Sequence, residues 1–254
     1  MLNWIRTTAL KSSPFLIGFS LAACGGGGGS SSSTSTPPAE TSVELTPGGY
    51  ATNIAFSDGS TVEAVTLLSP TGGFVVLVDF EDITLGTLQF GSNGSISGSG
   101  TDFYFEGGSW QTQSGTLSGE ALSASRASIK ATAPGYESTS TLVRDDQYSD
   151  LGVTLAELGG TYTMDVTGVF RTSVTISADG TITGSDETGC VFNGNVVIPD
   201  TQYNVYEVSY TAANCPDSQR NGQYSGLGAY DPGLAEVQFA GANDELAAFF
   251  IGQK

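Results

Sequence analysis

The chain has 254 residues and a formal net charge of −18, and only 13% of its residues are charged. Its 35 glycines and many serines and threonines favour short strands joined by tight turns over helices, whose exposed faces need Lys, Glu and Arg. Beyond residue 23 the basic residues are too scattered to form the positive cluster that binding to nucleic acid requires. They are Arg126, Lys130, Arg144, Arg171, Arg220 and Lys254.

The N-terminus has the layout of an export signal. Arg6 and Lys11 form a positive segment, which is followed by the apolar stretch Phe15 to Leu21. This stretch is too short to cross a bilayer, which takes about 20 apolar residues. We therefore expect residues 1–23 to be a signal peptide, whose removal leaves a mature chain with a charge of about −20.

The sequence Leu21-Ala22-Ala23-Cys24 resembles the lipobox of bacterial lipoproteins. The resemblance implies cleavage before Cys24 and lipidation of its thiol with a diacylglyceryl group, so that the mature protein carries two or three acyl chains such as palmitate. More than one chain makes release from a membrane negligible. In that family Asp after the cysteine retains a protein in the inner membrane, whereas Gly25 here implies the outer membrane, on its periplasmic or its surface face. The alternative is an ordinary secretory signal with a cysteine near its cleavage site.

A Gly/Ser/Pro-rich stretch follows the cysteine directly and has no periodicity that could build a core. We expect a flexible tether with an end-to-end distance of about 25 Å. The predicted organisation is a signal peptide at 1–23, the lipidated cysteine and tether at 24–46, a first β unit at 47–148, a linker at 149–158 and a second β unit with a disulfide at 159–254.

Two segments of the folded region align without a gap, Thr87 to Gly108 and Ser173 to Gly194. Each reads as a strand, an Asn-Gly or Asp-Gly turn and a second strand, because these dipeptides tolerate the positive φ values of tight hairpins. Gly48-Gly49-Tyr50 and Gly159-Gly160-Thr161-Tyr162 also begin the two units alike. The match indicates two similar β units, although Gly/Ser-rich hairpins also resemble one another through composition alone.

Sixteen short strands are predicted, eight in each unit. An all-β fold follows, with two tandem antiparallel meanders that each close as a small barrel or fold as a sandwich. A short helical turn is expected between them, capped by Tyr148-Ser149-Asp150 and running through Leu155, Ala156 and Leu158. The predicted strands are 50–57, 62–68, 74–80, 84–90, 95–105, 115–121, 127–133 and 138–144, then 161–166, 172–177, 181–185, 190–198, 203–210, 223–230, 235–239 and 246–251.

Most of these strands alternate apolar and polar residues, as a sheet with one buried face requires. The run from Phe74 to Val78 is apolar without alternation. We therefore expect both of its faces to be covered, with the second unit on one of them.

Once Cys24 is assigned to lipid, Cys190 and Cys215 remain as a pair in an oxidising compartment. We expect a disulfide between them. A redox-active pair is the alternative, but redox motifs usually place the two cysteines two residues apart.

The chain contains no histidine, which excludes Ser-His-Asp and Cys-His catalysis and histidine-ligated zinc. Adjacent carboxylates could in principle serve a glycoside hydrolase, but neighbouring residues of a strand point to opposite faces. No calcium-loop spacing is present either, so we predict no catalytic residue, metal or cofactor. The carboxylates considered are Asp79 with Glu81 and Asp82, Asp145 with Asp146, Asp186 with Glu187, and Asp244 with Glu245.

Aromatic residues near glycine-rich turns could stack on a sugar or pack on a partner, or could simply fill the core. They are Tyr104, Trp110, Tyr224 and Tyr230. We predict a non-enzymatic envelope lipoprotein that binds or displays something, with a protein, a glycan or a small molecule as the partner. The alternatives are a carrier of a small hydrophobic ligand inside a barrel and a carboxylate-dependent hydrolase.

The second unit resembles a domain of uncharacterised lipoproteins from Gram-negative bacteria over about 90 residues. The residues that carry the resemblance include Gly159 to Tyr162, Asp179 to Ser185, Gly189-Cys190, Tyr203 to Tyr206 and Gly222 to Gly226. The resemblance implies no known activity.

Overall fold

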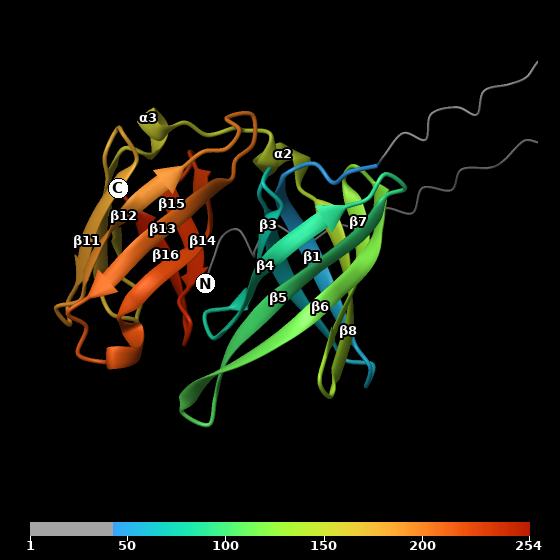
Figure 1. The fold of residues 1–254 in the computed structure, drawn as a ribbon. Coiled ribbons are helices and arrows are strands. Elements are labelled where there is room, and N and C mark those ends of the chain that lie inside the picture. Colours follow the sequence, from blue (N-terminus) through green and yellow to red (C-terminus); the bar gives the residue numbers. More distant parts are fainter. Residues whose placement is uncertain (1–42) are drawn as a thin grey trace, which may run out of the picture. The chain divides into compact units, whose positions relative to one another are not determined.

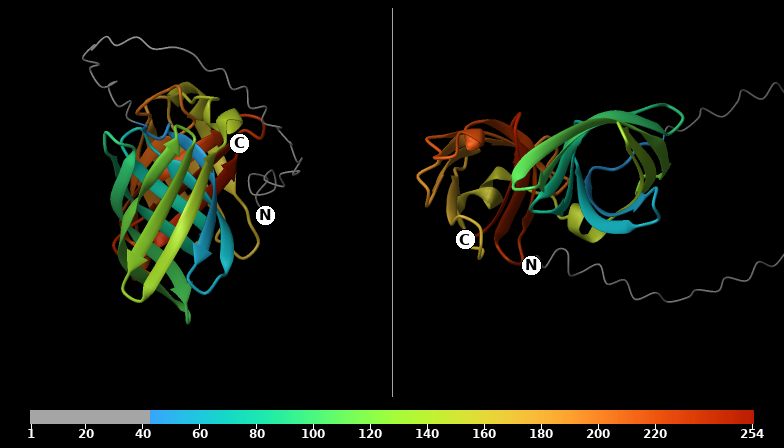
Figure 2. Two further views of the ribbon diagram at one scale, coloured as in Figure 1. Left: turned by 90° about the vertical axis from the view of Figure 1, so that its right-hand side faces the viewer. Right: turned by 90° about the horizontal axis from the view of Figure 1, so that it is seen from below.

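The computed structural model describes residues 43–254, which form sixteen strands in two closed eight-stranded barrels (Figures 1 and 2). Each strand pairs antiparallel with the next strand along the chain, so each barrel is a simple meander. The all-β class with two tandem units is therefore confirmed, and each unit is a barrel and not a sandwich. The predicted signal peptide, Cys24 and most of the predicted tether lie outside the described residues.

The first barrel closes through the pairing of β1 with β8, in which Tyr50 lies opposite Arg144. Seen from below, its strands form a complete ring (right-hand view of Figure 2). Its strands are β1 Gly48–Phe56, β2 Thr61–Leu68, β3 Gly73–Asp79, β4 Asp82–Phe90, β5 Ser95–Glu106, β6 Ser109–Ser123, β7 Arg126–Ala133 and β8 Tyr136–Arg144.

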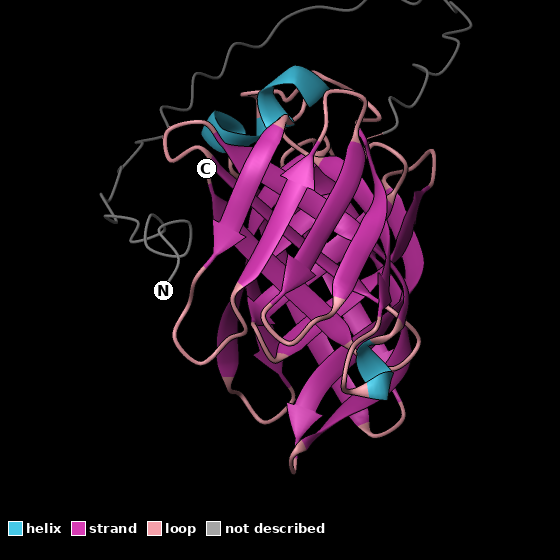
Figure 3. Ribbon diagram, turned by 90° about the vertical axis from the view of Figure 1, so that its left-hand side faces the viewer, coloured by secondary structure: helices cyan, strands magenta, loops and turns pink. Residues whose placement is uncertain are grey.

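The second barrel closes through β9, which pairs with β10 along its length and with β16 at Thr163 and Gln253. Strands dominate this part of the molecule as well (Figure 3). Its strands are β9 Gly160–Met164, β10 Thr172–Ile176, β11 Thr181–Asp186, β12 Val191–Val197, β13 Tyr206–Ala213, β14 Gly222–Asp231, β15 Glu236–Ala242 and β16 Ala247–Gln253.

The largest difference from the predicted strands is in β6, which begins at Ser109 instead of residue 115. Apart from Trp110 the segment from 109 to 114 is polar, and it has no alternating apolar face of its own. It is a strand because every residue from Ser109 to Glu120 pairs with β5, from Glu106 back to Ser95. Pairing with a neighbour thus overrides a weak local pattern.

Two short helices connect the barrels, α2 Asp146–Ser149 and α3 Leu155–Leu158. The predicted cap was wrong: α3 starts after Thr154, whose hydroxyl accepts a hydrogen bond from the Glu157 amide while the Glu157 carboxylate accepts one from the Thr154 amide. This reciprocal pair satisfies two amides that the first turn leaves free. A 3-10 helix spans Ser218–Arg220, and no helix within residues 43–254 is long and apolar enough to cross a membrane.

Both barrels begin in the same way. Gly48 and Gly160 open β1 and β9 with positive φ values of 142° and 155°. Two residues later in each barrel lies a buried tyrosine, whose hydroxyl donates a hydrogen bond to the carbonyl oxygen four residues before it. These bonds run from Tyr50 to Thr46 and from Tyr162 to Leu158. These equivalent first strands are the structural repeat between the two units.

The hairpin match found in the sequence has a different meaning. In both copies the last glycine of the turn, Gly94 or Gly180, donates to the carbonyl of the first turn residue and accepts from a third strand. However, the two turns join β4 to β5 and β10 to β11, which are not equivalent strands, and the turn at Ser69 to Gly72 makes the same bonds. The match therefore reflects a shared type of turn and not the register of a duplicated barrel.

The apolar run in β3 is covered on both faces, as predicted. Phe74 lies in the core of the first barrel, whereas Val75 and Leu77 point outward. The outward side chains pack with buried residues of the second barrel, including Val205 and Leu227.

Candidate functional site

The interior of the first barrel holds a cavity of about 430 Å³ that is lined by residues of all eight strands. Small-molecule sites span roughly 300–1,000 Å³, so this volume suits a small organic ligand. The walls are mostly apolar, with Ile54, Val62, Val76, Leu117 and Ile129 among the lining residues.

The barrel is hollow because several inward positions carry little or no side chain. Gly100 and Gly115 lie on the long strands β5 and β6, and Ala131, Ser138 and Ser140 lie on β7 and β8. An eight-stranded barrel is just wide enough for large side chains to fill it, so small residues at these positions leave space.

One end of the first barrel is closed by a core of fully buried apolar side chains. Tyr50, Leu68, Leu88 and Leu142 come from four of its strands, and Leu45, which precedes β1, packs against them. The cavity extends from this core toward the other end of the barrel, called here the open end, where the β1–β2, β3–β4, β5–β6 and β7–β8 turns lie.

Two carboxyl groups line the cavity near this open end, Asp82 at the start of β4 and Asp102 on β5. Thr84 donates its hydroxyl proton to Asp102 over 2.8 Å, and the Asp82 and Asp102 carboxyl groups are close enough to interact electrostatically. Burial, together with the negative charge of Asp102, raises the pKa of Asp82 to about 7. Below that pH Asp82 is protonated.

Aromatic rings surround the same end of the cavity. Tyr136, the first residue of β8, meets Phe56 edge to face, with ring centroids 5.9 Å apart, and Tyr104 lines the wall from β5. Burial raises the pKa of Tyr136, and the negative charges of Asp102 and Asp82 raise it further. The entrance therefore combines acidic and aromatic groups.

The interior of the second barrel is more aromatic than that of the first. Its core includes the tyrosines Tyr162, Tyr206, Tyr210 and Tyr224 together with Phe239. A hollow of about 480 Å³ remains at one end, but the aromatic rings of this core form much of its wall. A wider hollow of about 1260 Å³ is lined by residues of β3 to β5 and of β12 to β14.

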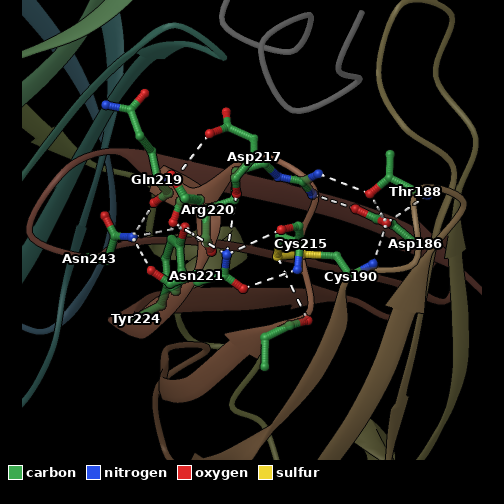
Figure 4. Close-up of a disulfide and its surroundings, with 12 residues drawn as sticks. Asp186, Thr188, Cys190, Cys215, Asp217, Gln219, Arg220, Asn221, Tyr224 and Asn243 are labelled. Atoms are coloured by element: carbon green, nitrogen blue, oxygen red, sulfur yellow. Dashed lines mark hydrogen bonds and ion pairs between the residues drawn. A yellow bond between two sulfur atoms is a disulfide. The ribbon is translucent and has the colours of Figure 1, made fainter.

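The predicted disulfide joins Cys190, immediately before β12, to Cys215, in the segment that follows β13 (Figure 4). Close to it, buried Asp186 accepts hydrogen bonds from the Thr188 side chain and pairs with Arg220. Burial opposes ionisation of Asp186, but the hydrogen bonds from Thr188 and Arg220 outweigh it and lower its pKa. The disulfide and this ion pair together fix the segment between β13 and β14 to the β11–β12 turn.

The carboxylate groups considered from the sequence are scattered over the structure. Most stabilise turns or form ion pairs: Asp79 accepts from the Glu81 amide, Asp145 caps α2, Asp146 pairs with Arg144 and Asp186 with Arg220. Glu187, Asp244 and Glu245 are exposed. Asp82 alone among them lines the cavity, and its partner is Asp102, which was not predicted.

The inward position of Asp102 could have been predicted from the alternation of residues along its strand. Ile96, Gly98, Gly100, Asp102 and Tyr104 alternate along β5, and Ile96 is buried in the core of the first barrel. Residues two apart face the same side of a strand, so this register places Asp102 inside.

The predicted aromatic binding residues are divided between two roles. Tyr224 and Tyr230 fill the second barrel, where Tyr224 stacks on Tyr210 with ring centroids 4.8 Å apart. Trp110 packs against the same core and meets Phe105 edge to face. Only Tyr104 lines the cavity of the first barrel.

No protein-family model matches the sequence, and neither a curated protein nor a solved structure gives a significant match. Within residues 43–254 no group of three or more carboxylate or cysteine side chains is arranged to hold a metal ion. The cavity of the first barrel is the candidate functional site.

Proposed function

We propose that this chain is a lipoprotein anchored to the outer membrane that acts by binding and not by catalysis, and that its first barrel carries a small apolar ligand. The cavity of about 430 Å³ inside that barrel supports the proposal most directly. Its apolar walls can shield a ligand from water, which is the main source of affinity in such sites.

We assign ligand binding to the first barrel and a structural or display role to the second because their interiors differ. The first barrel has small side chains at inward positions and is open at one end, which provides a route for a ligand. The second barrel has an aromatic core and a disulfide, which suit a structural or display role. The proposed lipid anchor at Cys24 would keep both at the membrane, where apolar ligands are concentrated.

A bulky side chain placed in the cavity is expected to prevent binding. Ser140 lines the cavity from β8, so Ser140→Phe should weaken the binding of octanol to residues 25–254 by at least about tenfold. Thr141→Phe is the matched control, because it puts the same ring on the exposed face of the same strand. Isothermal titration calorimetry measures both. Equal affinity in the two variants would place octanol elsewhere, and no binding to the unsubstituted protein would refute carriage of an apolar ligand.

Lipidation is tested separately. Because Cys24 supplies the only thiol of the lipobox-like sequence, Cys24→Ala should release the protein from the membrane fraction or leave it as an uncleaved precursor. Fractionation of cell envelopes with immunoblotting measures both outcomes. A variant that is processed and sedimented like the natural chain would show that the anchor was wrongly assigned.

A further inference from the structure

The charged groups in the cavity of the first barrel are all of one sign. Among the described residues that line it, Asp82 and Asp102 are acidic and none is basic. The rest of the lining is apolar, aromatic or neutral and polar. A ligand with a carboxylate or phosphate head would thus meet like charges in a partly dehydrated site, which is unfavourable.

The two carboxyl groups lie where the head group of an amphiphile would lie. They are on β4 and β5 toward the open end, whereas the closed end is formed by buried apolar residues such as Leu68 and Leu142. A ligand with its apolar tail toward the closed end therefore places its head beside Asp82 and Asp102.

Aromatic rings provide a second contact for such a head. Tyr104 and Tyr136 line the cavity on strands β5 and β8, and Phe56 lies against Tyr136. The face of an aromatic ring attracts a cation, more strongly where water is excluded. The Asp102 carboxylate and these rings favour the same kind of head group.

We propose that the ligand of the first barrel is a small amphiphile with an amine head, which binds as the ammonium ion between Asp82, Asp102 and the neighbouring rings. This inference rests on the proposed function, because it specifies the head group of the apolar ligand assigned to the same cavity. An ammonium group can donate hydrogen bonds to both carboxylates, and the alkyl chain fills the space that the glycines and serines leave.

Binding of a cation should also depend on pH. The groups that act on Asp82 are Asp102 on β5 and Asp79 on β3, and Tyr136 on β8 is electrostatically linked to both cavity carboxyls. With its pKa raised to about 7, Asp82 is protonated below neutral pH and must lose that proton to receive an ammonium ion. Affinity for the amine should therefore rise as the pH increases through 7, while the alkylamine itself stays charged.

The test compares three probes with the same alkyl chain, octylammonium, octanol and octanoate, by isothermal titration calorimetry on residues 25–254. At about pH 8 we expect octylammonium to bind at least about tenfold more tightly than octanol, and octanoate more weakly than either. Asp82→Asn should remove most of the preference for octylammonium over octanol, and also the rise in octylammonium affinity between about pH 6 and pH 8. The affinity of this variant for octanol should stay within about threefold of that of the natural chain. Glu63→Gln is the control, because it removes one carboxylate from the outer face of β2. It should change neither the preference for octylammonium nor its dependence on pH.

The outcomes separate the two proposals. Tight binding of octanol with no advantage for octylammonium, or with octanoate equal to it, would overturn the amine head group and leave apolar carriage intact. Failure of all three probes to bind would refute the proposed function and the amine head group with it. The comparison of probes on the unsubstituted protein decides the matter even if Asp82→Asn fails to fold.

Discussion

Removal of the disulfide is expected to lower the free energy of unfolding of the second barrel by about 3.5 kcal/mol. Cys190 and Cys215 are 25 residues apart in sequence, and the bond restricts a loop of that length in the unfolded chain. The effect is large compared with the total stability of a small domain, about 5–15 kcal/mol. The native structure has no other covalent link between the β11–β12 turn and the segment after β13 within the described residues.

The measurement is urea unfolding of the double variant Cys190→Ser/Cys215→Ser against the oxidised protein. The natural chain unfolded in the presence of a reductant should lose the same amount as the double variant, which controls for the serine side chains. A loss below about 1 kcal/mol would contradict this expectation and would mean that residual structure already restricts the loop in the unfolded chain.

Replacement of Gly194 by valine is expected to destabilise the second barrel by at least about 3 kcal/mol. Gly194 lies on β12 opposite Tyr210 of β13, and a Cβ atom there would overlap the Ser209 carbonyl oxygen and lie 2.5 Å from the Tyr210 Cα. Backbone atoms cannot move aside without disturbing the pairing of the two strands. The ring of Tyr210, which stacks on Tyr224, would lose its position as well.

Asn193→Val is the matched control for this substitution. Asn193 is the adjacent residue on the same strand, and its side chain is exposed on the outer face. Valine favours strands, so the control should stay within about 0.5 kcal/mol of the natural chain. Urea unfolding followed by tyrosine fluorescence measures both variants. If Gly194→Val were as stable as Asn193→Val, the backbones of strands β12 and β13 could not lie as close together at Gly194 as the structure shows.

Several features of the fold could be predicted because they depend on local chemistry. The positions of the strands follow from alternation, and the turns follow from glycine beside Asn or Asp, as at Gly94 and Gly180. The apolar run in β3 indicated two covered faces for the same reason, since a strand with one exposed face needs polar residues at every second position.

The prediction failed where distant partners decide the local structure. The start of β6 was missed because residues 109 to 114, apart from Trp110, are polar and form a strand only through pairing with β5. The cap of α3 was placed too early because Ser149 and Asp150 are equally good capping residues, and Thr154 is selected by Glu157 three residues after it.

By itself, the sequence determined the all-β class, the two units, the pairing of Cys190 with Cys215 and the expectation of a lipid anchor at Cys24, because each depends on residue type, spacing or order along the chain. Only the tertiary structure decided that each unit closes into a barrel, that the first is hollow and that Asp82 meets Asp102. Alternation indicates the face on which a residue lies but not the strands that meet it across the interior. The volume left inside depends on the sizes of side chains from all eight strands together, which no single segment specifies.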